Sequence, residues 1–155
     1  MRRTRLYVLI ATLFLVVAAA PASKKPTVRE DVQAFVRGFV DATNRADVTA
    51  VMEMYSQKAG IASIGDGEIT RGWDAIRTGS DEIVGKEGAY KVSLGSIDVM
   101  PIGTLNAIAF APYAVTITSD QGPVQLSGAI TLVLEKSGGA WKIVHEHTSF
   151  KAAQQ

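Results

Sequence analysis

The apolar residues of this chain follow one spacing in its first half and another in its second. In residues 28–55 and 73–84 they recur three or four positions apart, a pattern that buries one stripe of a helix. From Tyr90 onward they alternate with polar residues, a pattern that buries one face of a strand. Helices followed by a meander of antiparallel strands are typical of an α+β fold. We therefore expect three helices packed on a curved sheet around a cone-shaped, apolar interior.

The helical half divides into three predicted helices. Thr27 and Glu30 form a capping box, so the first helix should begin there and run to about Arg45. Asp47 is placed to cap a second, shorter helix. Residues 73–84 suit a third helix. Its inner side should carry three residues: Trp73, Ile76 and Ile83.

Two turns and two irregularities are expected among the strands. Residues 60–71 suit a short hairpin that turns at Gly65-Asp66-Gly67, and Gly138-Gly139 should turn the chain into its closing strand. The alternation changes phase at Gly95-Ser96, which predicts a bulge. Pro112 has no N–H group, so its strand should lie at an edge of the sheet or carry a bulge.

Residues 1–22 have the features of a secretory signal peptide. Three arginines precede an uncharged apolar run from Leu6 to Ala20, and Ala20-Pro21-Ala22 fits the small-x-small cleavage pattern. The apolar run has 15 residues, fewer than the ~20 that span a bilayer, so cleavage is favoured over a membrane anchor. We expect a periplasmic or secreted protein whose residues 23–155 form a single domain.

Charge and cysteine content exclude several classes of function. Without residues 1–22 the chain has 13 Lys+Arg against 15 Asp+Glu, a net charge of −2, so it lacks the basic footprint of a nucleic-acid-binding protein. The absence of cysteine excludes thiol catalysis and thiolate metal sites. No phosphate-binding glycine loop or dinucleotide fingerprint occurs. We expect no cofactor, no nucleic acid and, after signal cleavage, no membrane among the partners.

The closing strand, Trp141 to Ser149, carries both histidines of the chain, His145 and His147, with Glu146 between them. In a regular strand the histidines share one face with Trp141 and Ile143, and Glu146 points the other way. A zinc site needs at least three protein ligands, so two strand histidines predict no metal site.

Three segments of the chain resemble the NTF2-like superfamily. They are GFVDATNRADVTAVMEMYS (residues 38–56), GDGEITRGWDAIR (65–77) and WKIVHEHTS (141–149). The likeness covers residues 27–150 and is greatest to SnoaL-like, DUF4440-type members and to the association domain of calmodulin-dependent kinase II. The resemblance implies a conical α+β barrel, a pocket between sheet and helices, and a homodimer. It implies no particular reaction, because this fold hosts isomerases, dehydratases, cyclases, assembly domains and binding proteins.

The ketosteroid isomerase branch of the superfamily provides a chemical test, because it combines an Asp base with an oxyanion hole of Tyr and protonated Asp. Aligned with this chain, that tyrosine falls on Phe39, the base near Ser63, and the protonated acid near Ile130 or Thr131. Ser63 cannot abstract a carbon-bound proton unaided, and Phe39 cannot donate a hydrogen bond. The resemblance therefore does not imply isomerase activity.

Glu146 is the main candidate for chemistry. Resemblance to the kinase association domain places Val144, Glu146 and Thr148 on the pocket face, with Thr148 where that domain has a ligand-binding arginine. A carboxyl in an apolar cone has a raised pKa and could act as a general acid or base, whereas an ion pair with Arg71 or Arg77 would be structural. If a bulge reverses the strand, His145 and His147 face the pocket instead. The catalytic candidates are Glu146, His145 and His147, and the ligand-binding candidates are Tyr55, Trp73, Tyr113, Thr148 and Arg71.

Three functions fit these residues. The leading hypothesis is binding of a small, mostly apolar ligand, which needs an apolar cavity with a few hydrogen-bonding groups. A lyase, isomerase or hydrolase would need Glu146 and His145 or His147 to converge in that cavity. A homo-oligomeric assembly module could have its cone filled by side chains.

Overall fold

The computed structural model describes residues 25–65, 67–119 and 121–151, and the predicted signal peptide lies outside these ranges. Helices and strands succeed one another as the sequence predicts for an α+β fold. The elements are α1 (Val28–Asn44), α2 (Val48–Glu53), β1 (Ala62–Gly65), β2 (Glu68–Arg71), α3 (Trp73–Ile83), β3 (Tyr90–Leu94), β4 (Asp98–Ile102), β5 (Asn106–Ser119), β6 (Gly122–Ser137) and β7 (Ala140–Phe150).

The first two helices begin at the predicted caps. The Thr27 hydroxyl accepts from the Glu30 N–H at 3.3 Å, and the Glu30 carboxylate accepts from the Thr27 N–H at 2.7 Å. The Asp47 carboxylate accepts from the Ala50 N–H at 3.0 Å and starts α2. The apolar stripe of α1 is buried at Val32, Val36, Phe39 and Val40.

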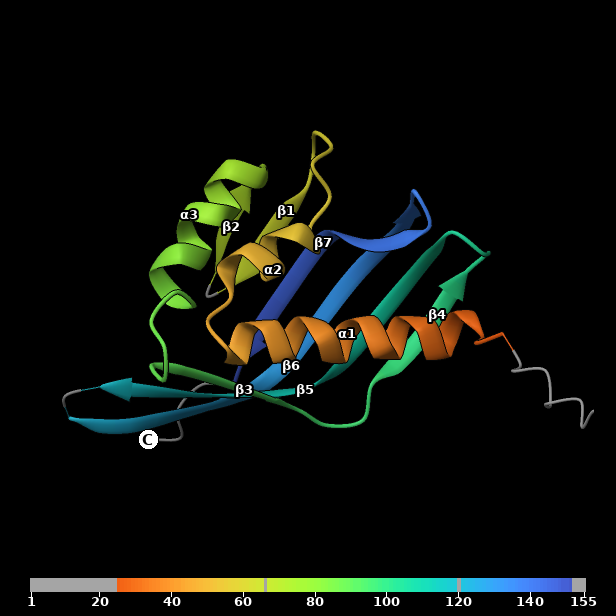
Figure 1. Ribbon diagram of the computed structural model, residues 1–155. Coiled ribbons are helices and arrows are strands. Elements are labelled where there is room, and N and C mark those ends of the chain that lie inside the picture. The colour runs from red at the N-terminus through yellow and green to blue at the C-terminus, as the bar shows by residue number, and fades with distance from the viewer. Residues whose placement is uncertain (1–24, 66, 120, 152–155) are drawn as a thin grey trace, which may run out of the picture.

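The described strands form one curved sheet on which the helices pack (Figure 1). The main strand order is β2-β1-β7-β6-β5-β3, and β4 pairs with β5 beyond the end of β3. All pairs are antiparallel except β1 with β7. α1 contacts β3, β4 and β5, whereas α3 contacts α2 and β2. This leaves an interior between α3 and the sheet.

The predicted irregularity at Gly95 is a break between two strands. β3 ends at Leu94 and β4 begins at Asp98, and both pair with β5. Pro112 lies on β5 opposite this break, where the Gly95 N–H donates to its carbonyl at 2.9 Å. Because β5 is flanked on both sides, the edge alternative for Pro112 is wrong, and the missing N–H is accommodated at the irregularity.

β7 contains a bulge at Val144, a position that the sequence does not predict. Val133 pairs with His145, but the next residue, Leu134, pairs with Ile143, so Val144 is the extra residue. Ile143 and Glu146 therefore lie on the same face of the sheet. The expectation that Trp141 and Ile143 share the face of the histidines is wrong for this reason.

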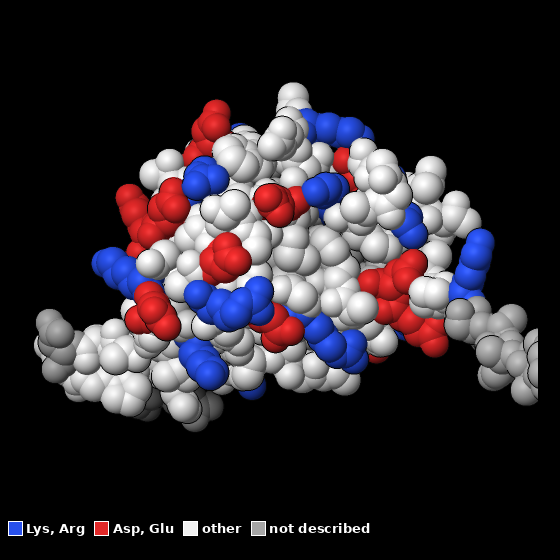
Figure 2. All heavy atoms as spheres, viewed as in Figure 1, with Lys and Arg blue, Asp and Glu red and all other residues white. Residues whose placement is uncertain are grey.

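The surface and the helices are those of an ordinary mixed-charge domain. Acidic and basic side chains are interspersed over the face shown in Figure 2, without a single-sign field. In the ranges that the structure describes, no helix combines the length and apolar character needed to cross a membrane.

Candidate functional site

A cavity of about 670 Å³ lies between α3, the inner face of α1 and the concave side of the sheet. Its volume is in the range of small-molecule sites. Most of its wall is apolar, with hydroxyl groups and a few charged residues added. Those central to the argument below are Phe39, Tyr55, Ser63, Ile83, Tyr90, Tyr113, Glu146, Thr148 and Phe150.

Tyr55 and Glu146 meet in this cavity. The Ser56 N–H donates to the Ile143 carbonyl at 2.9 Å, and the Ile143 N–H donates to the Met54 carbonyl at 2.8 Å, which holds Tyr55 beside β7. The Val144 bulge then turns Glu146 to the same side, and the buried Tyr55 hydroxyl donates to its carboxyl. Two local backbone features thus bring the two groups together.

Burial dominates the ionisation of both groups. It raises the pKa of Glu146 above its ordinary value, and the hydrogen bonds from Tyr55 and Ser63 oppose that rise only in part. The pKa of Tyr55 is raised well above its ordinary value, first by burial and then by the adjacent Glu146 charge. Ser63 is the register neighbour of Glu146 on β1. The site therefore presents a carboxyl that takes up a proton more readily than an exposed one.

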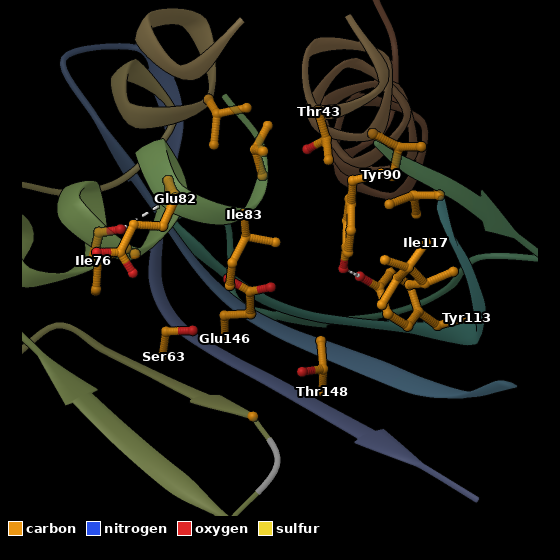
Figure 3. A pocket seen from close by; sticks show the side chains of 18 of the residues that line it. Thr43, Ser63, Ile76, Glu82, Ile83, Tyr90, Tyr113, Ile117, Glu146 and Thr148 are labelled. Atoms are coloured by element: carbon orange, nitrogen blue, oxygen red, sulfur yellow. Dashed lines mark hydrogen bonds between the residues drawn. The ribbon is translucent and has the colours of Figure 1, made fainter. Parts of the chain in front are cut away.

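Two further polar features line the cavity: a pair of tyrosines opposite Glu146, and Thr148 on the same strand as Glu146 (Figure 3). The Tyr90 and Tyr113 hydroxyls hydrogen-bond each other at 2.7 Å, joining β3 to β5. The Thr148 hydroxyl donates to the Ile64 carbonyl at 3.4 Å, and Gly65 leaves room for it, since a Cβ there would lie 3.0 Å from that oxygen. Tyr55, Tyr113 and Thr148, all predicted ligand-binding residues, thus line the cavity together.

The two histidines lie elsewhere. His145 pairs with Val133 and His147 with Thr131 on the face of the sheet opposite to Glu146, and neither lines the cavity. The Val144 bulge is the reason, because it sets Glu146, not the histidines, in phase with the buried residues. The predicted partnership of Glu146 with His145 or His147 therefore has no support in the geometry.

Trp73 and Arg71 also lie outside the cavity. The Trp73 indole N–H donates to the Met52 carbonyl at 3.2 Å, so this side chain packs α3 against α2. Arg71 is exposed at the end of β2. Arg77 lies over the Trp73 ring and pairs with Asp81, with 3.7 Å between their charged atoms. Within the described residues no ion pair involves Glu146, so the structural alternative with Arg71 or Arg77 is wrong.

Sequence reasoning missed several lining residues. Tyr90 follows from the strand alternation, since it is in phase with the buried Val92. Ile83 was expected inside, but it is 56% exposed and borders the cavity at the end of α3. The sequence identifies Phe39 and Ser63 as positions that lack the isomerase groups and does not predict that they line the cavity. In the part of the chain that the structure covers, no cluster of three or more His, Asp or Glu is placed to hold a metal.

Comparison with known proteins places these features in a family. The sequence profile of the SnoaL-like domain matches residues 32–153. No curated protein matches the chain in sequence.

Solved structures share the fold at low identity. A candidate calcium/calmodulin-dependent protein kinase II association domain from Xanthomonas campestris has a TM-score of 0.70 and 20% identity, covering 88% of this chain and 95% of its own. An NTF2-like superfamily protein from Salmonella enterica serovar Typhimurium has a TM-score of 0.70 and 18% identity, covering 80% and 91%. A candidate dehydratase of the NTF2-like family from Streptomyces avermitilis has a TM-score of 0.70 and 16% identity, covering 80% and 96%. These likenesses confirm the predicted NTF2-like fold.

Proposed function

The chain belongs to the SnoaL-like domain family, and we propose that it binds a small, mostly apolar ligand in its conical cavity. The observation that carries the proposal is the cavity itself: about 670 Å³ of space with a mostly apolar wall and a few inward hydroxyls around the carboxyl of Glu146. A binding site needs this combination, because apolar area supplies affinity and sparse polar groups fix orientation. An assembly module has no need of such an open interior.

A neutral solvatochromic dye, Nile red, tests the proposal. We expect its fluorescence to rise and shift to the blue on binding, and the signal to fall when the cavity entrance is obstructed by Ile83→Trp. Ile83 is 56% exposed, so a larger side chain is tolerated there. Leu105→Trp is the matched control, because Leu105 is 58% exposed and outside the cavity. Equal dye binding by both variants would count against the cavity as the binding site.

Acid–base catalysis at Glu146 is the second candidate function. One observation favours it: burial raises the pKa of this carboxyl inside a cavity. With the histidines on the far side of the sheet, the partner of Glu146 would be Tyr55, which already donates to it. A structural neighbour from Streptomyces avermitilis described as a candidate dehydratase is consistent with a lyase of this kind.

Homodimerisation through the outer face of the sheet is part of the proposal. Phe110 pairs with Thr131, which pairs with His147, and Met100 lies in the row that contains His145, so these side chains share the outer face. Phe110 and Met100 are 44% and 51% exposed. We name Phe110, Met100, His145 and His147 the outer patch; a second copy would cover its apolar members.

Export is likewise proposed, on the strength of residues 1–22 alone. Their arginines, apolar run and small-x-small motif support a periplasmic or secreted location. Mass spectrometry of the protein recovered outside the cytoplasm should find a new N-terminus at Ser23. Recovery of the intact N-terminus in the cytoplasmic fraction would contradict it.

A further inference from the structure

We propose that the ligand of the cavity is a hydrophobic amine, and that Glu146 is the counter-ion of its ammonium group. This inference rests on the proposed function and adds the chemical class of the ligand. It is drawn from the charge of the cavity wall, from its aromatic rings, and from the way in which the Glu146 carboxyl is held.

The charged residues of the wall are predominantly acidic. Among the residues that the structure describes, they are Glu68 on β2, Glu82 on α3, Glu146 on β7 and, after α3, the cation Lys86. The ion pairs of the described residues engage other acids, namely Glu135, Asp81 and Asp31. A cationic ligand group would therefore meet a complementary field, whereas a carboxylate ligand would meet repulsion.

Aromatic rings surround the same space. Phe39 and Tyr55 pack edge to face with 6.1 Å between ring centroids, and Tyr113 and Phe150 lie 5.7 Å apart. All four line the cavity together with Tyr90. A desolvated ammonium is attracted to ring faces by cation–π interaction, and the apolar remainder of an amine gains from burial against the same rings.

The carboxyl of Glu146 is arranged as an acceptor. Tyr55 donates to one of its oxygens, and Ser63 contributes a second hydrogen bond that favours the ionised form. Both partners are neutral hydroxyls, so within the described ranges a negative charge here has hydrogen bonds but no ion-pair partner. A neutral ligand with only a carbonyl would need Glu146 to donate a proton instead. An ammonium group supplies both a positive charge opposite the Glu146 carboxylate and an N–H donor to it.

Binding of an amine should depend on pH in a definite direction. Burial raises the pKa of Glu146 in the protein without ligand, so binding an ammonium must release a proton whenever the carboxyl is protonated. The titratable groups around it are Tyr55 before β1, Glu68 on β2, Glu82 on α3, Lys86 after it, Tyr90 on β3 and Tyr113 on β5. Affinity for an amine should therefore rise with pH, whereas a carbonyl ligand bound to protonated Glu146 would show the opposite slope.

Three probes of one shape test the proposal: phenylbutylamine, phenylbutanol and phenylbutyrate, each displacing Nile red from the purified protein. At about pH 8 the amine is protonated, as a lysine side chain is. We expect it to bind about tenfold or more tightly than the alcohol, with the carboxylate weakest. Glu146→Gln should abolish the preference for the amine, and Glu53→Gln, an exposed change outside the cavity, should preserve it.

Calorimetry of the unaltered protein gives a readout that does not depend on a variant folding. Titration in two buffers of different ionisation enthalpy, repeated at falling pH until Glu146 is protonated in the free protein, should show net proton release with the amine and none with the alcohol. Equal affinity for amine and alcohol at every pH, with Nile red still bound, would overturn the proposal that the ligand is an amine. The cavity would then remain a binding site for another class of ligand. Failure of Nile red to bind in a way that Ile83→Trp reduces would remove the proposed function and this inference together.

Discussion

The hydroxyl of Tyr55 donates a hydrogen bond to the carboxyl of Glu146, 91 positions later in the chain. Tyr55 follows a short helix, and Glu146 lies beyond the bulge in the closing strand. The contact is therefore produced by the tertiary fold and not by residues that are neighbours in the sequence. Their meeting places the half-buried carboxyl of Glu146 in the cavity wall. The behaviour of this pair is therefore the most direct test of the site.

Replacing Tyr55 by Phe should remove that donor while keeping the ring. Because the hydrogen bond favours ionised Glu146, the pKa of the carboxyl should rise further in Tyr55→Phe. The free energy of unfolding should fall by about 1–3 kcal/mol, the usual cost of leaving a buried partner unpaired. Carboxyl NMR titration and urea denaturation measure the two effects. A Glu146 pKa that is unchanged or lower would show that the contact does not operate in solution.

Stability should decline with pH because of Glu146. Its pKa is raised by burial in the folded state, so above the ordinary carboxyl pKa the folded protein holds a proton that the unfolded chain has lost. The free energy of unfolding then falls as pH rises, until the folded pKa is passed, by about 1.4 kcal/mol for each pKa unit of difference. Glu146→Gln should remove this decline, gaining stability relative to the parent as pH increases in urea titrations. Parallel pH profiles for the two proteins would contradict the raised pKa.

The sequence predicted the elements well because their signals are local. The capping box at Thr27, the cap at Asp47 and the turn at Gly138-Gly139 each lie in the residues that form them. The resemblance to the kinase association domain put Val144, Glu146 and Thr148 on the cavity face, and of these Glu146 and Thr148 line the cavity whereas Val144 is the bulge residue. It could not say which neighbours would accompany them, because those contacts join segments far apart in the chain.

The closing strand shows where sequence reasoning fails. A bulge shifts the phase of every residue after it, and Val144 has no glycine or proline to mark it. Simple alternation therefore placed Trp141 and Ile143 with the histidines, although both are buried and lie on the face that carries Leu132 and Leu134. The bulge lies where β7 changes its neighbour from the segment at Tyr55 to β1. That change of pairing partner depends on the tertiary fold, so the residues around Val144 do not predict it.

Deleting Val144 should be far more damaging than shortening it. Without the extra residue, either Glu146 leaves the cavity or Ile143, which is fully buried, turns outward. Loss of one such buried aliphatic side chain costs about 2–5 kcal/mol, so the deletion should lower the melting temperature steeply or prevent folding. Val144→Ala retains the residue count and should be close to the parent. Thermal melts of both variants measure this, and equal stability would show that the bulge is dispensable.

Asn44 should stabilise the strand that carries Tyr90. Its side-chain amide donates to the Val92 carbonyl at 3.0 Å and accepts from the Val92 N–H at 2.7 Å, so the end of α1 pairs with an edge strand. Asn44→Ala should lower the free energy of unfolding by about 1–3 kcal/mol and speed hydrogen exchange at the Val92 N–H. Arg37→Ala, an exposed change on the same helix, is the control. Unchanged exchange at Val92 in Asn44→Ala would show that β3 holds its place without this contact.

Charge on the outer patch should separate the proposed dimer. Phe110 is 44% exposed. A stable dimer buries about 800 Å² on each partner, and a carboxylate within that area would have to lose its water on association. Phe110→Glu should therefore give a monomer by light scattering, with its circular dichroism unchanged. Leu105→Glu makes the same change at a residue that is 58% exposed in the turn between β4 and β5, off the sheet face, and should leave the dimer intact. A parent protein that is monomeric at high concentration, or a Phe110→Glu variant that remains dimeric, would show that a second copy does not cover this face.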